Sequence, residues 1–252
     1  MEKWNLLDLP DELKVNEKDG SILVKIPEGE FEMGDEEDLD CPKHRIYLNG
    51  YCIGMYAVTN RQYKRFVVET GHRAPDEADI GYPVWKERNY PDVYADHPVV
   101  CVNWEDAKAY SEWAGLSLAT EAQWEKAARG PGNFKYPWGN GWENKALSCM
   151  DNNRGSEITA SVNASPDRMS GYCLYGTSGN VWEWCLDWYD RKYYESSPPK
   201  NPDGPSEGKY RVMRGGIWRN DARLCRSAFR SYTFASIRLT YCGFRLASIA
   251  EL

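Results

Sequence analysis

Histidine is scarce in this sequence, with only His44, His72 and His97 among 252 residues. A metal site built from three histidines would need all of them, and we do not expect one. No apolar run approaches the roughly 20 residues that a membrane-spanning helix requires, so we expect no transmembrane segment. The sequence also lacks a GxSxG motif and a P-loop, which removes the usual signatures of serine hydrolases and nucleotide-binding proteins.

The eight cysteines form no CxxC pair and show no zinc-like spacing. Cys52, Cys101 and Cys185 lie within apolar runs, and we expect them to be buried thiols. The even count is also compatible with disulfides, whose pairing the spacing does not determine. No secretory signal is visible, because residues 1–10 carry Glu, Lys and Asp among their apolar residues. The sequence is also compatible with a secretory signal that has been removed.

Aromatic residues are abundant, with 11 Trp and 17 Tyr, and they can bury a large area per residue in a compact core. Residues 21–34 alternate like a strand, and the chain after Gly130 has the composition of loops with short strands. We expect an α+β fold, with an N-terminal arm over residues 1–20 and a single domain over residues 21–252. Capping signals predict three helices, which run from Thr59 to Gly71, from Asn103 to Gly115 and from Thr120 to Gly130.

The positive charge is concentrated near the C-terminus. Residues 209–247 hold nine basic residues and one acid, Asp221, a local charge of +8 in a chain whose net charge is −7. One interpretation is a cationic face for an acidic partner. The favoured interpretation is structural, because arginines in a regular frame typically pair with buried carboxylates. The rest of the chain is acidic, and the sequence contains no known nucleic-acid-binding motif. We therefore do not expect a nucleic acid as a partner.

The same C-terminal segment alternates between two kinds of position. A frame comprises RGG (214–216), Trp218, Ala222, Arg223, CRSA (225–228), Arg230 and GFRLA (243–247). The positions between them follow neither strand nor helix periodicity, which is typical of a binding face. These fifteen gap residues are Ile217, Arg219, Asn220, Asp221, Leu224, Phe229, Ser231, Tyr232, Thr233, Phe234, Ser236, Ile237, Leu239, Thr240 and Tyr241.

Six further motifs precede this frame in order: FEMG (31–34), VTN (58–60), PVVCVNWEDA (98–107), TEAQWEKAARG (120–130), YPWGN (136–140) and GNVWEW (179–184). Together the seven resemble the formylglycine-generating-enzyme family, whose fold is related to that of C-type lectins. The resemblance implies a C-type-lectin-like domain with few helices, a small antiparallel sheet and much irregular loop.

The oxidases of that family use two cysteines, five positions apart after the RGG turn, as copper ligands and redox thiols. Here Cys225 stands alone, and residues 218–221 contain no cysteine. We therefore expect no enzymatic activity, no catalytic residue and no cofactor. The alternative is an oxidase of the formylglycine-generating or ergothioneine type, or a catalytically inactive accessory of that family.

The resemblance also implies a weak calcium candidate in the GNVWEW motif. In the oxidases the ligands are two carbonyls, a glutamate and a side-chain oxygen three residues before the first glycine. Gly179, Val181 and Glu183 match, but Gly176 offers no side-chain oxygen. Calcium prefers six to eight oxygen ligands, so this loss weakens the site, and Glu183 could pair with a frame arginine instead.

The alternation of frame and gaps resembles the variable proteins of diversity-generating retroelements, of the Treponema variable protein type. In that group, mutation of the adenines of asparagine codons cannot produce Lys, Glu, Gln, Met or Trp. None of these residues stands at a gap position. The resemblance implies a non-enzymatic display protein whose variable region, about 214–247, forms a solvent-exposed binding face. We expect five frame side chains to point inward: Trp218, Arg223, Cys225, Ala228 and Phe244.

For such a display protein the expected partner is a protein or another surface ligand, and the expected state is a monomer. The expected location is a bacterial cell surface or the secreted fraction, with a lipid anchor as one mode of attachment. A cytoplasmic location stays open.

Overall fold

The computed structural model describes residues 13–142 and 159–248. Cys149 and residues 1–12 of the expected arm lie outside these described residues. The elements in chain order are β1 (Leu13–Val15), β2 (Ile22–Ile26), β3 (Gly29–Met33), β4 (His44–Leu48), β5 (Tyr51–Gly54), α1 (Asn60–Thr70), α2 (Trp104–Trp113), β6 (Ser117–Leu118), α3 (Glu121–Arg129), β7 (Trp182–Tyr189), α4 (Tyr193–Ser196), β8 (Tyr210–Arg214), β9 (Ser231–Thr233), β10 (Cys242–Phe244) and β11 (Leu246–Ser248).

The three predicted helices are present with the predicted starts. Thr59, Asn103 and Thr120 each form a capping box, in which the cap side chain and the side chain three residues later satisfy each other's backbone amide. Helix α1 ends at Gly71, whose φ of 75° is the left-handed conformation that glycine adopts without strain. The capping signals in the sequence therefore predicted these helices correctly.

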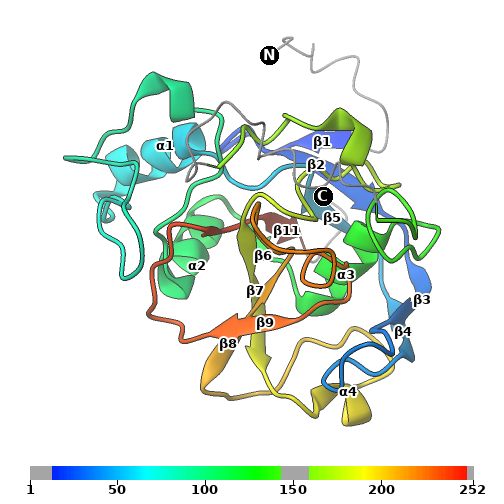
Figure 1. The fold of residues 1–252 in the computed structure, drawn as a ribbon. Coiled ribbons are helices and arrows are strands. Elements are labelled where there is room, and N and C mark those ends of the chain that lie inside the picture. The colour runs from blue at the N-terminus through cyan, green and yellow to red at the C-terminus, as the bar shows by residue number, and fades with distance from the viewer. Residues whose placement is uncertain (1–12, 143–158, 249–252) are drawn as a thin grey trace.

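Two larger sheets and one hairpin carry the rest of the fold. The five-stranded sheet has the order β1-β2-β5-β11-β6, the four-stranded sheet has the order β10-β7-β8-β9, and β3 pairs with β4. Strand β10 runs parallel to β7, whereas β7, β8 and β9 are antiparallel. Arg245 alone separates β10 from β11, so the C-terminal segment joins the two larger sheets. Figure 1 shows β7, β8 and β9 (yellow to orange) crossing the lower half of the molecule.

The N-terminal boundary differs from the expected arm. Leu13–Val15 forms β1 and pairs antiparallel with β2 along the edge of the five-stranded sheet. The polar residues around this short strand concealed it, because its own side chains are only half-buried. The alternating stretch 21–34 likewise divides into two strands, β2 and β3, which belong to different sheets.

Buried rings dominate the core beneath α1 and α2. Tyr63 stacks on Tyr110 with 5.6 Å between the ring centroids, and Phe244 meets both rings edge-on. The expected burial of Cys52, Cys101 and Cys185 is confirmed, and each of the seven described cysteines is free. Among the described residues, no helix has the length and apolar character needed to cross a membrane.

Candidate functional site

Buried arginines anchor the C-terminal segment to helix α3. Arg214, at the end of β8, donates to Glu125 and, at 3.3 Å, to Glu121. Arg230 binds both carboxylate oxygens of Glu121, at 2.8 and 2.9 Å. The Arg214 guanidinium also donates to the carbonyls of Ser227 and Ala228, at 2.6 and 2.9 Å. Burial lowers the pKa of Arg214, but the charges of Glu125, Tyr194 and Glu121 more than offset this and raise it. These arginines are structural.

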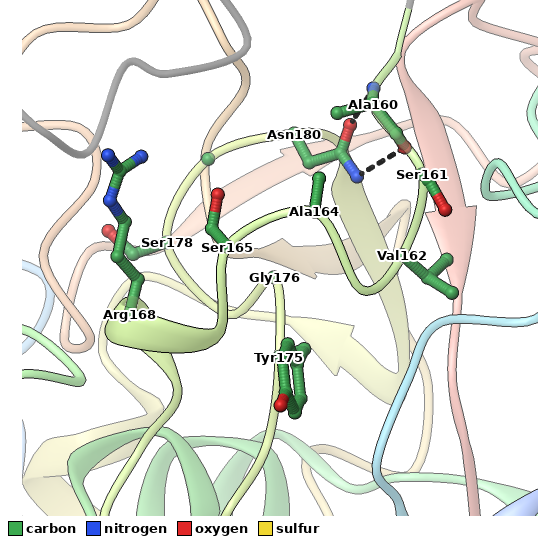
Figure 2. Close-up of a pocket in the computed structure, with 11 residues that line it drawn as sticks. Ala160, Ser161, Val162, Ala164, Ser165, Arg168, Tyr175, Gly176, Ser178 and Asn180 are labelled. Atoms are coloured by element: carbon green, nitrogen blue, oxygen red, sulfur yellow. Dashed lines mark hydrogen bonds between the residues drawn. The ribbon is translucent and has the colours of Figure 1, made fainter. Parts of the chain in front are cut away.

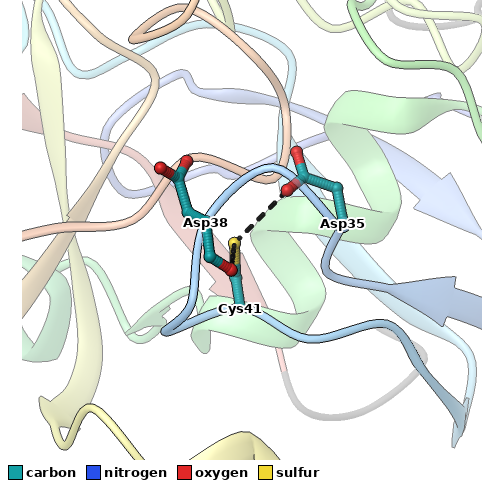
Figure 3. Close-up of side chains that lie close together, drawn as sticks. All are labelled: Asp35, Asp38 and Cys41. Carbon is teal, nitrogen blue, oxygen red and sulfur yellow. Dashed lines mark hydrogen bonds between the residues drawn. The ribbon is translucent and has the colours of Figure 1, made fainter.

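A third frame arginine neutralises an acidic turn. Asp35, Asp38 and Cys41 lie together, with potential ligand atoms within 4.8 Å of one another (Figure 3). Arg226 donates to Asp35 at 2.9 Å and also to Asp38, so its guanidinium occupies the position a cation would need. Burial raises the pKa of the Cys41 thiol to about 12, which keeps it protonated. The carboxylates of this turn therefore bind Arg226 and not a metal ion.

The fourth arginine occupies the calcium candidate. Arg245 donates to both oxygens of Glu183, at 2.6 and 2.7 Å, and Trp124 donates to the same carboxylate at 2.7 Å. Glu183 is 1% exposed, so it has no free oxygen to offer a metal ion. The residues Gly179, Val181 and Glu183 therefore do not fit a calcium ion. The alternative pairing of Glu183 with a frame arginine is what the structure contains.

The three histidines make separate hydrogen bonds. His44 contacts the carbonyl of Pro42, His72 contacts Asp106, and His97 contacts Thr159. No metal-ligand group within residues 13–142 and 159–248 includes a histidine.

Thirteen of the fifteen gap residues are at least partly accessible. Their contact with a ligand stays a prediction. The exposed ones are Arg219, Asp221, Tyr232, Phe234 and Ser236, and the half-buried ones are Asn220, Leu224, Phe229, Ser231, Thr233, Ile237, Thr240 and Tyr241.

Three positions correct the expected division between frame and gaps. Ile217 and Leu239 are 7% and 4% exposed and belong to the main core, because the loops turn inward at both positions to cover it. Arg223 points outward instead of inward, and its side chain is 62% exposed. It forms only a long ion pair of 3.9 Å with one oxygen of Asp38, whose other oxygen binds Arg226.

Two gap residues also shape their own loop. The Asn220 side chain accepts a hydrogen bond from the Ile217 amide at 2.8 Å. The Asp221 side chain accepts from the amides of Arg223 and Leu224, at 3.0 and 3.2 Å. Such turns explain why Asn and Asp are suited to these positions.

Cys225 lies beneath this loop. It is 1% exposed, and burial together with the charge of Asp221 raises the pKa of its thiol to about 12. Gly216 has a φ of 75°, and a Cβ there would lie 3.1 Å from the Cys225 sulfur. The second glycine of the RGG turn thus makes room for the thiol. Position 220, five residues before Cys225, is Asn, and the described residues do not fit a two-thiol copper site.

Two hollows border this region. A cavity of about 40 Å³ lies between residues 160–168 and the turn 175–180, where Asn180 holds the backbone of Ala160 (Figure 2). Ser178, in the wall of this cavity, donates to the carbonyl of Cys225 at 2.8 Å. A more polar cleft of about 280 Å³ lies between residues 32–43, the end of α3 and Ala228.

Aromatic residues outside the gap positions, two of them half-buried and one exposed, extend the accessible surface. Tyr189 stacks on Tyr232 at 3.9 Å, and Tyr210 contacts both Tyr232 and Phe234. Tyr82 is 88% exposed in a loop that bonds to the backbone of residues 238–240. Sequence reasoning missed these rings because it considered only positions after Arg214. For Tyr82 a signal was available, because a tyrosine that follows a turn glycine such as Gly81 is often exposed.

A buried carboxyl beside this region has a strongly shifted pKa. Asp187 is 3% exposed and accepts a hydrogen bond from the Glu121 amide at 2.7 Å. Burial, and then the charge of Glu121, raise the pKa of Asp187 to about 8.

We therefore expect Asp187 to make folding pH-dependent. An unfolded aspartate ionises near pH ~4. Unfolding between about pH 5 and 8 thus releases a proton from Asp187, so the stability from this group is lost as the pH rises. Asp187→Asn should flatten the fall of the unfolding free energy over this range, measured by urea denaturation at several pH values. If the slope of unfolding free energy against pH is the same in both proteins, the raised pKa of Asp187 is contradicted.

Known proteins provide the comparison for this geometry. The sequence matches the sulfatase-modifying factor enzyme 1-like domain family over residues 9–250. A formylglycine-generating enzyme of Streptomyces coelicolor is 36% identical over 284 aligned residues, covering 91% of this chain and 90% of the relative. One from Thermomonospora curvata is 34% identical, covering 90% of this chain and 93% of the relative.

A solved structure supports the fold. Treponema denticola variable protein 1 superposes with a TM-score of 0.75 at 22% identity, covering 96% of this chain and 100% of that one. This likeness confirms the expected C-type-lectin-like α+β fold. The display role and the surface location stay predictions.

The expectation that this chain is not an enzyme is contradicted. Relatives named formylglycine-generating enzyme, including one from Mus musculus, are 32–36% identical over about nine-tenths of the chain. A hercynine oxygenase of Mycolicibacterium smegmatis is 28% identical over 89% of the chain. The expectation rested on the absence of one cysteine. Sequence similarity to these enzymes along nearly the whole chain outweighs that single difference. This chain belongs to the formylglycine-generating-enzyme family.

Proposed function

We propose that this chain is an oxidising enzyme of the formylglycine-generating type that acts on a cysteine in a polypeptide substrate. The observation that carries the proposal is the similarity to enzymes of that name over about nine-tenths of the chain. The exposed aromatic and arginine side chains of residues 219–241 offer a surface on which a polypeptide can bind.

The reaction has a defined balance. The cysteine side chain becomes an aldehyde and its sulfur leaves as hydrogen sulfide. One O₂ and two molecules of a thiol reductant are consumed, and one water and one disulfide are formed. We assign no step to copper, because the described residues lack the second thiol. Cys225 is the thiol that follows the RGG turn, and we place the reaction beside it.

The test is conversion of a cysteine-bearing peptide under air with a thiol reductant, with and without added copper, followed by mass spectrometry. We expect wild-type protein to replace the peptide thiol with an aldehyde, and Cys225→Ser to reduce conversion to background. Cys173→Ser is the matched control, because Cys173 is exposed and should be dispensable. The proposal fails if wild type forms no aldehyde under either condition.

A second candidate function is display of the C-terminal loops as a diversified ligand-binding face. The exposure of Arg219, Tyr232 and Phe234 above a frame fixed by buried ion pairs favours it. Sequencing the end of this gene in sibling strains tests this function. Differences restricted to the gap positions would support it, and an even spread of differences would argue against it.

A further inference from the structure

Strand β9 lies at the edge of the four-stranded sheet (Figure 1). One side of β9 pairs with β8, where Val212 faces Tyr232. Within the described part of the chain, the backbone of Ser231–Thr233 makes no hydrogen bond except with β8. An edge of this kind presents unpaired amides and carbonyls to which an extended chain can add.

Rings cover the sheet face beside this edge. Tyr232 and Phe234 are 46% and 45% exposed, and Tyr189 of β7 and Tyr210 of β8 contact them. Partly exposed rings held by other rings bind with little loss of side-chain freedom, as tyrosines do in antibody binding sites.

A lysine lies beside two of these rings, while the Tyr189 hydroxyl donates to Asp40 at 2.8 Å. The Lys209 ammonium lies 5.2 Å from the centre of the Tyr210 ring and 5.4 Å from that of Phe234. No carboxylate of the described residues forms an ion pair with Lys209, unlike the buried frame arginines. A carboxylate on the ligand would complete this arrangement.

From these observations we propose that β9 binds an extended acidic polypeptide segment as an added strand. Its backbone hydrogen-bonds to the free edge of Ser231–Thr233. Alternate side chains stack on Tyr232 and Phe234, and a Glu or Asp of the segment meets Lys209. This inference rests on the proposed function for the polypeptide nature of the substrate, and it adds the binding mode and the preferred charge.

The experiment uses the full chain and a nine-residue peptide that alternates Glu with Tyr or Thr and contains one cysteine. Amide hydrogen exchange at Ser231–Thr233 should slow when the peptide is added. N-methylation of the alternate peptide amides that face β9 should weaken binding roughly tenfold, because each methyl group blocks a hydrogen bond to the strand edge. Peptides methylated at the two alternating sets should differ, because only one set faces β9.

Charge exchange tests the role of Lys209. Lys209→Glu should weaken binding of the Glu peptide about fivefold, as expected for an exposed ion pair, and a Lys peptide should recover affinity for this variant. Lys64→Glu is the control, since Lys64 lies on α1 and contacts Asn89. Tyr232→Ser should weaken both peptides alike, because it removes a stacking partner without altering charge.

The proposal is overturned if the affinity for the peptide is changed neither by N-methylation nor by Lys209→Glu. It is also overturned if an oligosaccharide displaces the peptide, or if β9 gains protection through self-association seen by sedimentation. Failure of the proposed function is distinguishable. If aldehyde forms and is unaffected by Lys209→Glu and by methylation, the oxidase activity is supported and binding at β9 is refuted. If exchange at β9 slows but no aldehyde forms, binding at β9 is supported and the oxidase activity is refuted.

Discussion

Arg214→Met should destabilise the protein by about 3–5 kcal/mol, the usual consequence of removing one partner of a buried ion pair. Arg214 is fully buried between Glu121 and Glu125. Its removal leaves the two carboxylates with one cation fewer and the carbonyls of Ser227 and Ala228 without a donor. Thermal and urea denaturation would measure the change, with a fall in melting temperature of roughly 10 °C.

Arg219→Met provides the matched control, because it makes the same chemical change on the exposed side of the same segment. Arg219 lies 4.5 Å over the Trp218 ring and is in no ion pair within the described ranges. Its substitution should alter stability by no more than about 0.5 kcal/mol. If both variants lose equal stability, Arg214 is not the anchor that its contacts indicate.

Trp218→Ala is the second substitution with a large expected effect. Trp218 is 9% exposed and packs in the main core with Trp182 and Leu239. Loss of the indole leaves a cavity as well as removing buried apolar area, so we expect a cost of roughly 3–5 kcal/mol.

Tyr82→Ala is the control for this prediction, because it also removes a large ring. Tyr82 is 88% exposed, and its truncation should leave the urea midpoint nearly unchanged. A Trp218→Ala variant as stable as Tyr82→Ala would mean that the loops carry their own packing and that Trp218 is not a core residue.

Local signals predicted the fold well where the chemistry is local. Each capping box lies within four consecutive residues, so Thr59, Asn103 and Thr120 are recognisable without any knowledge of tertiary contacts. The weaker signal of β1 was missed, because its three residues become a strand only by pairing with β2. Pairing of that kind is not encoded in the strand itself.

The site was less predictable, because its contacts join distant parts of the sequence. Arg226 meets Asp35 across 191 positions, and Arg245 meets Glu183 across 62. The arginines could be assigned to a frame, but their carboxylate partners could not be named. The outward direction of Arg223 and the inward direction of Ile217 depend on how the loop turns, which Asn220 and Asp221 determine through backbone hydrogen bonds.

The junction of β10 and β11 has a consequence for engineering. The loops over residues 217–241 begin after Arg214 and end before Arg245, so both of their ends are fixed by buried ion pairs, of Arg214 with helix α3 and of Arg245 with strand β7. The entropic cost of closing a loop rises only slowly with its length. The molecule is therefore suited to serve as a scaffold: foreign peptide inserted at the exposed tip near Asp221 would be held between two rigid supports.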